Sequence, residues 1–308
     1  MERSGPSQTR RAAKKTPTSG RLGVRPSLQE EQPVDGVGIQ AAEILNERDS
    51  RKHMPVMIEI YPLAGIGEIT PGSNLVAVLA DALAAARTGP PRPGDALVVT
   101  QKIVSKAEGR FVDLADVTPG TEALRLAGIT RKDPRLVELI LSESTAVVRA
   151  VPNVLIMRHR HGHVMANAGI DQSNIGSSGS DRVLLLPIDP DASAERLRQG
   201  LGECFEAAPA VIISDSFGRP WRNGVVCVAI GASGLPALID RRGELDRDGR
   251  PLEVTQIALA DMIATAAGLA TGEGAEGIPA ALLRGAAWPK GSSLASSLVR
   301  PLEQDLFR

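Results

Sequence analysis

Residues 253–285 read "EVTQIALADMIATAAGLATGEGAEGIPAALLRG", an apolar segment, a glycine-rich loop and a second apolar segment. The spacing predicts a helix over 253–270 and a buried strand over 278–285. Residues 272–277 match Gly-x-Gly-x-x-Gly, the pattern of dinucleotide-binding proteins, in which a strand precedes the glycines and a helix follows them. Here that order is reversed, and Glu273 and Glu276 stand where they would repel a pyrophosphate. The sequence therefore excludes the dinucleotide-binding fold.

The same loop favours a different chemistry. The sequence holds no Gly-x-x-x-x-Gly-Lys-[Ser/Thr] phosphate loop, so a nucleotide would need other contacts. Carboxylates beside glycines suit Mg²⁺ or Mn²⁺, hard cations that prefer oxygen ligands and in turn bind phosphates.

Composition limits the class of protein. Of 308 residues, 43% are hydrophobic but only 2% aromatic, which predicts a core of Ala, Val, Leu and Ile. A net charge of -1 argues against a nucleic-acid binder with a broad basic face. The two cysteines, Cys204 and Cys227, are not a Cys-x-x-Cys pair, and one disulfide is the most they could form, so a reducing cytoplasm is the expected compartment. Polar residues interrupt the longest apolar run, 254–271, so no membrane span is expected.

Residues 1–54 differ from the rest of the chain. They contain no aromatic residue, and the first 25 carry seven basic residues against one acidic residue. Such a segment buries too little apolar surface to offset the entropy of ordering. The sequence predicts a disordered basic extension over 1–54 and one domain over 55–308.

Periodicity and turn signals predict the elements of that domain. Four helices are expected, over 73–87 with Ser73 as N-cap, 133–144 with Asp133 as N-cap, 193–207 and 253–270. Strands are expected over 57–66, 95–105, 146–151, 153–170 with a turn near Gly162, 210–216, 225–234 and 278–285. Because helices and strands do not alternate regularly, we predict an α+β fold with mixed or largely antiparallel sheets and flanking helices.

Three acidic loops border predicted core strands: "NAGIDQSN" (167–174), "SDSFGRPWRNG" (214–224) and "GEGAEGIP" (272–279). Each alone is typical of turns. Together, carboxylates at strand ends with a hydroxyl and guanidinium groups are what phosphoryl transfer requires. They predict a metal–phosphate site, and Lys106, Arg219 and Arg222 are the candidates for holding anionic groups.

Five segments in order resemble the coenzyme F420-0:L-glutamate ligase family, also called coenzyme F420 γ-glutamyl ligases. They are "IVSKAEGR" (103–110), "NAGIDQSN", "SDSFGRPWR" (214–222), "DRDGRPLEVTQIALADMIA" (246–264) and "GEGAEGIPAALLRG" (272–285). The likeness runs from about Met57 to Gly285. It implies the stand-alone form, without the nitroreductase-like domain that follows the ligase in some relatives.

The resemblance implies a function and an assembly. Members attach L-glutamate to the lactyl carboxylate of coenzyme F420-0, and then further γ-linked glutamates, using GTP. The carboxylate is activated as an acyl phosphate, and GDP and phosphate are released. The resemblance also implies two divalent ions (Mg²⁺ or Mn²⁺), K⁺ and an intertwined homodimer.

The site residues implied by the resemblance fall into two sets. Asp171 and Asp215 would bind the first divalent ion, and Ser216 and Glu273 the second. The nucleotide contacts would be Gly65, Ile66, Gly67, Glu68, Gln101, Lys102, Lys106, Asn174, Thr271, Gly272, Glu273, Gly274, Ala275, Glu276, Gly277 and Ile278. Ser216 stands where relatives often have Thr, and Gln101-Lys102 where they often have Ser-Thr, which leaves the choice between GTP and ATP open.

Other residues admit two interpretations. His159, His161 and His163 could form a metal clip, but we interpret them as solvated turn residues. Trp221 could stack on a deazaflavin or pack within its loop. Asp261, the only charge between Val254 and Gly272, is interpreted as a buried, hydrogen-bonded structural residue.

Two other functions remain open from the sequence. An amide ligase of the same fold acting on another acid would keep the metal carboxylates and change the substrate pocket. A non-catalytic deazaflavin- or nucleotide-binding protein would not need those carboxylates.

Overall fold

The computed structural model describes residues 57–176 and 181–306. The chain divides into two units, Met1–Met54 and Pro55–Arg308. The extension predicted over 1–54 lies outside the described residues. No helix in the described ranges is both long and apolar enough to span a bilayer.

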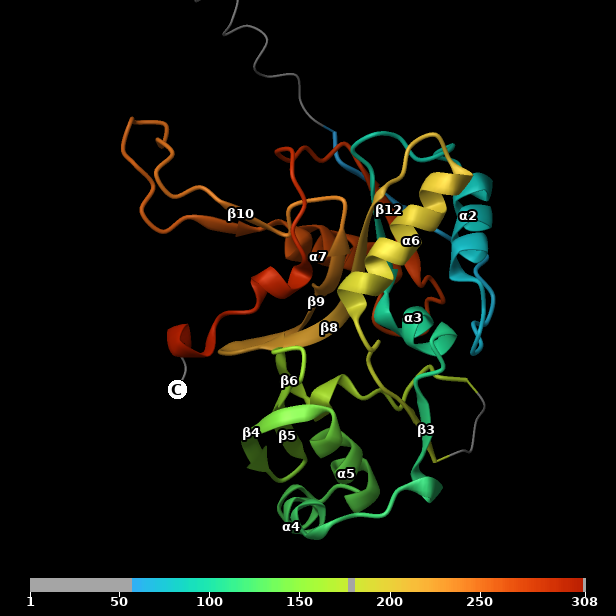
Figure 1. Ribbon diagram of the computed structural model, residues 1–308, viewed down its shortest axis with the longest axis vertical. Helices are drawn as coiled ribbons and strands as arrows, with labels where there is room; N and C mark the ends of the chain where they lie inside the picture. The colour runs from blue at the N-terminus through green and yellow to red at the C-terminus, as the bar shows by residue number, and fades with distance from the viewer. Residues whose placement is uncertain (1–56, 177–180, 307–308) are drawn as a thin grey trace, which may run out of the picture. The chain divides into compact units, whose positions relative to one another are not determined.

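The described residues form strands and helices in mixed order (Figure 1). The strands are β1 (Glu59–Pro62), β2 (Ala96–Thr100), β3 (Phe111–Asp113), β4 (Ser144–Val151), β5 (Val154–His159), β6 (Val164–Ala166), β7 (Arg182–Leu184), β8 (Ala210–Arg219), β9 (Arg222–Ser233), β10 (Leu238–Asp240), β11 (Gln256–Ala258) and β12 (Ala280–Arg284). The α-helices are α2 (Leu75–Ala85), α3 (Gln101–Ala107), α4 (Thr121–Thr130), α5 (Pro134–Ser142), α6 (Pro190–Cys204) and α7 (Leu259–Thr271).

A five-stranded sheet with the order β1-β12-β2-β8-β9 organises the domain. Strand β12 lies between β1 and β2 and is antiparallel to both. Strands β2 and β8 are parallel, and β8 and β9 form a long antiparallel hairpin. The smaller sheets β4-β5-β6, β3-β7 and β10-β11 are antiparallel. The predicted α+β class with mixed and antiparallel sheets is therefore confirmed.

The sheet carries a core on each face because successive side chains of a strand point to opposite sides. On one face, Leu97 and Val99 of β2 pack with helices α2 and α6. On the other, Ala96 and Val98 pack with the alanine-rich side of α7. As the composition predicted, these cores consist mainly of aliphatic residues. Small alanine side chains let α7 approach the sheet closely.

A third core lies in the part built from α4, α5 and the β4-β5-β6 sheet. Leu126 of α4, Ile140 of α5 and Met157 of β5 are almost completely buried there. Figure 1 shows this group of elements beside the hairpin formed by β8 and β9. The segment 167–171 runs from this core towards the five-stranded sheet and places Asp171 at the rim of that sheet.

Several predicted ends of helices and strands are wrong. The strand predicted over 95–105 ends at Thr100, and α3 begins at the next residue. Helix 253–270 begins only at Leu259, after the short strand β11. The N-cap of α2 is Asn74, whose side chain accepts a hydrogen bond from the Ala77 amide (3.2 Å), whereas the Ser73 hydroxyl accepts one from Thr70. The predicted Asp133 cap of α5 is confirmed.

Of the three histidines at the β5–β6 turn, His159 is not the solvated residue that we predicted, whereas His161 and His163 are partly exposed. His159 is completely buried, its Nε2 lies 3.6 Å from Glu143, and its ring is 4.3 Å from that of His161. Burial lowers the pKa of His163 to about 4, so that ring is neutral at physiological pH. The predicted turn itself is confirmed, with Gly162 at φ 89°.

Asp261 is the structural residue that we predicted. Its carboxylate accepts a hydrogen bond from the Ala229 amide (2.9 Å), which ties α7 to β9. Burial raises the pKa of Asp261 above its ordinary value. Both cysteines are free thiols, Cys204 exposed and Cys227 buried, so they do not pair with each other.

Candidate active site

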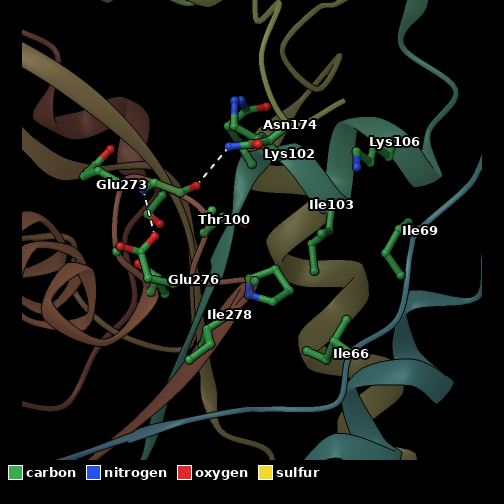
Figure 2. Close-up of a pocket in the computed structure, with 18 of the residues that line it drawn as sticks. Ile66, Ile69, Thr100, Lys102, Ile103, Lys106, Asn174, Glu273, Glu276 and Ile278 are labelled. Atoms are coloured by element: carbon green, nitrogen blue, oxygen red, sulfur yellow. Dashed lines mark hydrogen bonds between the residues drawn. The ribbon is translucent and has the colours of Figure 1, made fainter. Parts of the chain in front are cut away.

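A cavity of about 500 Å³ opens at the edge of the five-stranded sheet (Figure 2). Its walls come from four places far apart in the sequence: the segment after β1, the junction of β2 with α3, the middle of the β8–β9 hairpin, and the loop between α7 and β12. Asn174 and Gly176 complete the lining. The cavity therefore exists only once the whole sheet has formed.

The two sides of the cavity differ in polarity. Figure 2 shows four isoleucines gathered at one side and Lys102, Asn174 and Glu273 at the other. The isoleucines are Ile66, Ile69, Ile103 and Ile278. A ligand with an aromatic part and an anionic part would find apolar walls for the first and charged groups for the second.

Helix α3 carries both lysines of the site because positions i and i+4 lie on one face of a helix. Lys102 and Lys106 both line the cavity. Lys106 is only 6% exposed, and its ammonium lies 2.6 Å from Glu68 of the opposite wall. Because Lys106 lines the cavity, its ammonium is placed to bind an anionic group of a ligand as well as Glu68.

Asp171 is bound by the start of the same helix. Lys102 Nζ and Gln101 Nε2 both lie 2.5 Å from its Oδ2. The Gln101 side chain is fixed in turn by the hydroxyl of Ser105, at 2.9 Å. The first turn of α3 therefore positions Asp171 at the rim of the cavity.

Asp215 and Ser216 lie within a strand rather than at its end. We predicted a polar loop after 216, but β8 continues to Arg219 and pairs with β9 along that length. Because neighbouring side chains of a strand point to opposite sides, the two residues serve different parts of the site. The Ser216 hydroxyl lies 2.7 Å from both carboxylate oxygens of Glu273. The carboxylate of Asp215 instead interacts electrostatically with the charged groups of Asp171 and Lys102.

The negative charges of Asp171, Asp215 and Glu273 together favour the binding of a cation. Burial raises the pKa of Asp215, and the charge of Asp171 and, more weakly, that of Glu273 raise it further, to about 7, against the opposing effect of Lys102. Burial beside Glu273 likewise raises the pKa of Cys227 to about 11. Carboxylates that raise one another's pKa are stabilised by a bound positive charge.

The loop after α7 is built from glycines for a geometric reason. Gly272 ends α7 with φ 68° and ψ -178°, a conformation that is essentially restricted to glycine. A Cβ there would lie 2.2 Å from the Glu276 carboxyl carbon. That carboxylate accepts a hydrogen bond from the Gly274 amide (2.7 Å), and the Gly274 carbonyl accepts one from Asn174 (3.0 Å), both visible in Figure 2.

The oxygen donors of the site fit Mg²⁺ or Mn²⁺. Asp171, Asp215, Ser216 and Glu273 offer carboxylate and hydroxyl oxygens, the ligands that these hard cations prefer. Among the described residues, no three His, Cys, Asp or Glu side chains already stand together as a metal cage. Mg²⁺ commonly takes only one or two carboxylates and completes its shell with water and phosphate, so this arrangement suits a cation that binds together with a nucleotide.

Not every predicted site residue reaches the cavity. All the predicted nucleotide contacts line it except Gly65, which lies one residue outside. Asp171 does not line the cavity itself but contacts Lys102 and Gln101, which do. Arg219 and Arg222 face each other near the end of the β8–β9 hairpin and do not line it. Trp221, between them, is 89% exposed with φ 61°, so it is not packed within its loop.

Sequence reasoning missed several residues of the cavity. Cys227 lies 3.5 Å from Glu273, and Thr100, Ser214 and Ile103 line the wall. The only available signal was the pairing of β8 with β9, which places Cys227 opposite Ser216. The sequence could have predicted that pairing only if β8 had been expected to extend beyond residue 216.

Comparison with known proteins places the chain in a family. Residues 65–285 match the family model described as F420-0:Gamma-glutamyl ligase. The chain is 43% identical over 219 residues to the coenzyme F420:L-glutamate ligase of Methanocaldococcus jannaschii, covering 71% of this chain and 86% of the relative. It is 46% identical over 217 residues to the enzyme of that name from Methanothermobacter thermautotrophicus (70% and 85%), and 41% over 255 residues to that of Methanopyrus kandleri (82% and 98%). The chain therefore belongs to the F420-0:Gamma-glutamyl ligase family.

Proposed function

We propose that this protein is a cytoplasmic homodimeric ligase that attaches L-glutamate to the lactyl carboxylate of coenzyme F420-0, and then adds further γ-linked glutamates. GTP is the proposed energy source, and GDP and phosphate are the products. Membership of the family supports a ligase, and the relatives' names give F420 and L-glutamate as the reactants.

The reaction needs activation because a carboxylate has no adequate leaving group. In the proposed first step, the carboxylate of F420-0 attacks the γ-phosphorus of GTP, which releases GDP and gives an acyl phosphate. The amine of glutamate then attacks the acyl carbon, and phosphate leaves as the amide forms. The two-sided cavity supports this reaction, since it offers apolar walls for a purine and cationic groups for phosphates.

The chain's own residues have separate roles in this proposal. Lys102 and Lys106 bind phosphate oxygens, and the Gly272–Gly277 loop lines the same cavity. Asp171 and Asp215 would hold one divalent ion, and Ser216 and Glu273 the other, with K⁺ as a further cation. Bound there, these ions would neutralise phosphate charge during transfer.

Arg219 and Arg222 are proposed to bind anionic groups of the acceptor substrate from the hairpin. They stand outside the cavity of their own chain, so their target is the part of the substrate that protrudes from it. Their guanidinium groups suit carboxylates and phosphodiesters, which accept paired hydrogen bonds.

One observation carries the proposal. Asp215 and Glu273 line one cavity together with two lysines, and Asp171 contacts one of those lysines, in a chain of this family. The test is to incubate the purified full chain with F420-0, L-glutamate, GTP and Mn²⁺ and to analyse the product by mass spectrometry. We expect F420-0 to gain glutamyl residues, with one GDP released for each.

Matched omissions make the assay specific. Omitting glutamate, omitting Mn²⁺ in the presence of a chelator, or replacing GTP by ATP identifies the requirement for each component. A product that forms equally well without nucleotide, or no glutamylated product from a well-folded protein, would show the proposal to be wrong.

A further inference from the structure

Two donors share a single oxygen of Asp171. Lys102 Nζ and Gln101 Nε2 each lie 2.5 Å from Oδ2. Both donors come from the first turn of α3, where Gln101 is 2% exposed and held by Ser105. The amide is therefore a fixed contact, whereas the ammonium is a contact at the end of a long chain.

A divalent cation and Lys102 compete for this carboxylate. A metal ligand donates oxygen lone pairs to the cation, and the same lone pairs accept the hydrogen bonds of the ammonium. Two positive charges on one carboxylate also repel each other strongly in a partly desolvated site. A cation that binds Oδ2, the oxygen that Lys102 and Gln101 already share, therefore displaces the Lys102 ammonium.

We propose that Lys102 is an internal counter-ion that occupies Asp171 until a divalent cation arrives, and that the released ammonium then binds the nucleotide's phosphates. This inference rests on the proposed function, because it assumes a cation at Asp171. It makes Lys102 a positioning residue that couples the binding of cation and nucleotide.

The surroundings of the two lysines support different roles. The Lys102 side chain is 29% exposed and lines the cavity, so it has room to move from Asp171 into the space beside it. The Lys106 side chain is only 7% exposed and ends on Glu68, on the other wall. Its flexible stem lets Lys102 exchange partners, whereas burial restrains Lys106.

The exchange has a thermodynamic consequence. Without nucleotide, binding of the cation breaks the Lys102–Asp171 ion pair, and the released ammonium gains no new anionic partner. With nucleotide, the displaced ammonium gains a phosphate. Cation and nucleotide should therefore strengthen each other's binding, and the coupling must be reciprocal.

The test compares the binding of Mn²⁺ to the full-length wild type and to K102M. Binding is measured from the electron paramagnetic resonance signal of the Mn²⁺ that remains free. Without nucleotide, K102M should bind Mn²⁺ roughly tenfold more tightly, the worth of a partly buried ion pair that no longer has to be broken. K106M is the matched control, because it removes the same charge one helical turn away without touching Asp171. Its affinity for Mn²⁺ should change by less than about threefold, as expected of a screened charge.

A double-mutant cycle isolates the contact. In the D171N background, the K102M change should no longer tighten Mn²⁺ binding. A second arm measures the affinity for a non-hydrolysable GTP analogue, where K102M should weaken binding more with Mn²⁺ than with a chelator. If K102M is poorly folded, each measurement is repeated with K102Q, whose side chain is also neutral but polar.

The outcomes separate this inference from the proposed function. Equal Mn²⁺ affinity of wild type and K102M, or equal tightening by K106M, would overturn the counter-ion role alone. An absence of Mn²⁺ binding in all the folded variants would overturn the metal site, and both proposals with it.

Discussion

Arg284, the last residue of β12, forms a bidentate ion pair with Asp95, immediately before β2. Arg284 Nε lies 3.0 Å from Asp95 Oδ1, and Nη2 lies 2.6 Å from Oδ2. Both side chains are buried, and the guanidinium also donates to the carbonyls of Thr88 and Pro90. The pair therefore fixes the start of β2 against the end of its antiparallel neighbour.

We predict that R284M destabilises the protein by about 3–5 kcal/mol, since it leaves the Asp95 carboxylate buried without its partner. Urea denaturation of the variant and wild type measures the difference. The control is R125M, which removes an exposed partner of Glu122 and should leave the stability almost unchanged, since exposed ion pairs contribute little. Similar losses for the two variants would contradict this account of the buried pair.

Glu143 gives the stability a dependence on acid pH. Burial alone would raise its pKa, but the nearby His159 ring and the charges of Arg160 and Arg110 outweigh burial and lower the pKa to about 2. The unfolded carboxyl has a pKa of 4.5, so the unfolded state takes up its proton first as the pH falls. The stabilisation is complete above pH 4.5 and is lost between there and about pH 2.

E143Q should therefore cost about 2–3 kcal/mol at pH 7 and progressively less below pH 4.5. The measurement is the free energy of unfolding of variant and wild type in urea from pH 7 to pH 3. The matched control is E138Q, since Glu138 bonds only the Gly120 amide on the surface. A cost of E143Q that stays constant over this range would refute the ionic explanation.

Asp215 is predicted to be essential for turnover but not for folding. D215N keeps the size of the side chain and removes a negative charge opposite the proposed cation. We expect glutamate-dependent GDP release to fall at least ~10²-fold, as for the loss of one preorganised electrostatic contact. The melting temperature should not fall, because burial makes the charged form of Asp215 costly.

D240N is the control for D215N. Asp240 is exposed on β10, bonds Arg242 and lies outside the cavity. It should retain near-normal turnover. Near-normal turnover of D215N at low Mn²⁺ would refute the metal assignment.

The conformation of Gly272 is predicted to matter for nucleotide binding. G272A should lower stability by about 1–3 kcal/mol, because alanine does not readily adopt this backbone conformation, and it should displace Glu276 from the Gly274 amide. Affinity for a GTP analogue, measured by calorimetry, should fall with it. G243A has a comparable positive φ (86°) outside the cavity, so it should lose stability while keeping its affinity.

We expect the protein to be a homodimer. In the described part of the chain, Trp221, Val254 and Leu269 are each more than four-fifths exposed, and a dimer interface would remove such apolar surface from water. Light scattering at micromolar concentration should give twice the chain mass. A monomeric mass with full activity would exclude the dimer.

The sequence predicted the fold class because its strongest signals were local. The Gly162 turn, the Asp133 cap and the helix–loop–strand order around Gly272 all depend on neighbouring residues. The β2–α3 boundary was missed because residues 96–104 are mostly apolar and β-branched, a pattern that fits a buried strand or a buried helix equally well.

Other errors have non-local causes. Gly218 and Pro220 gave residues 217–224 the composition of a loop, but pairing with β9 extends β8 to Arg219. His159 was expected to be solvated, yet Glu143 and its arginine partners bury it from elsewhere in the chain. The acidic segments were expected to form one site because each borders a predicted core strand, but no spacing rule predicted the contact of Asp171 with the first turn of α3.

The position of β12 constrains the order in which the protein can assemble during synthesis. The strands β1 and β2 are made early but do not pair with each other, because the last strand of the sheet separates them. The ribosome must therefore release residues 280–284 before either early strand gains its antiparallel neighbour. Until then, the edges of β1 and β2 stay open to wrong partners, as in other late-closing sheets. A nascent chain that stalls before residue 280 would expose these edges for longest, and a chaperone would bind it there.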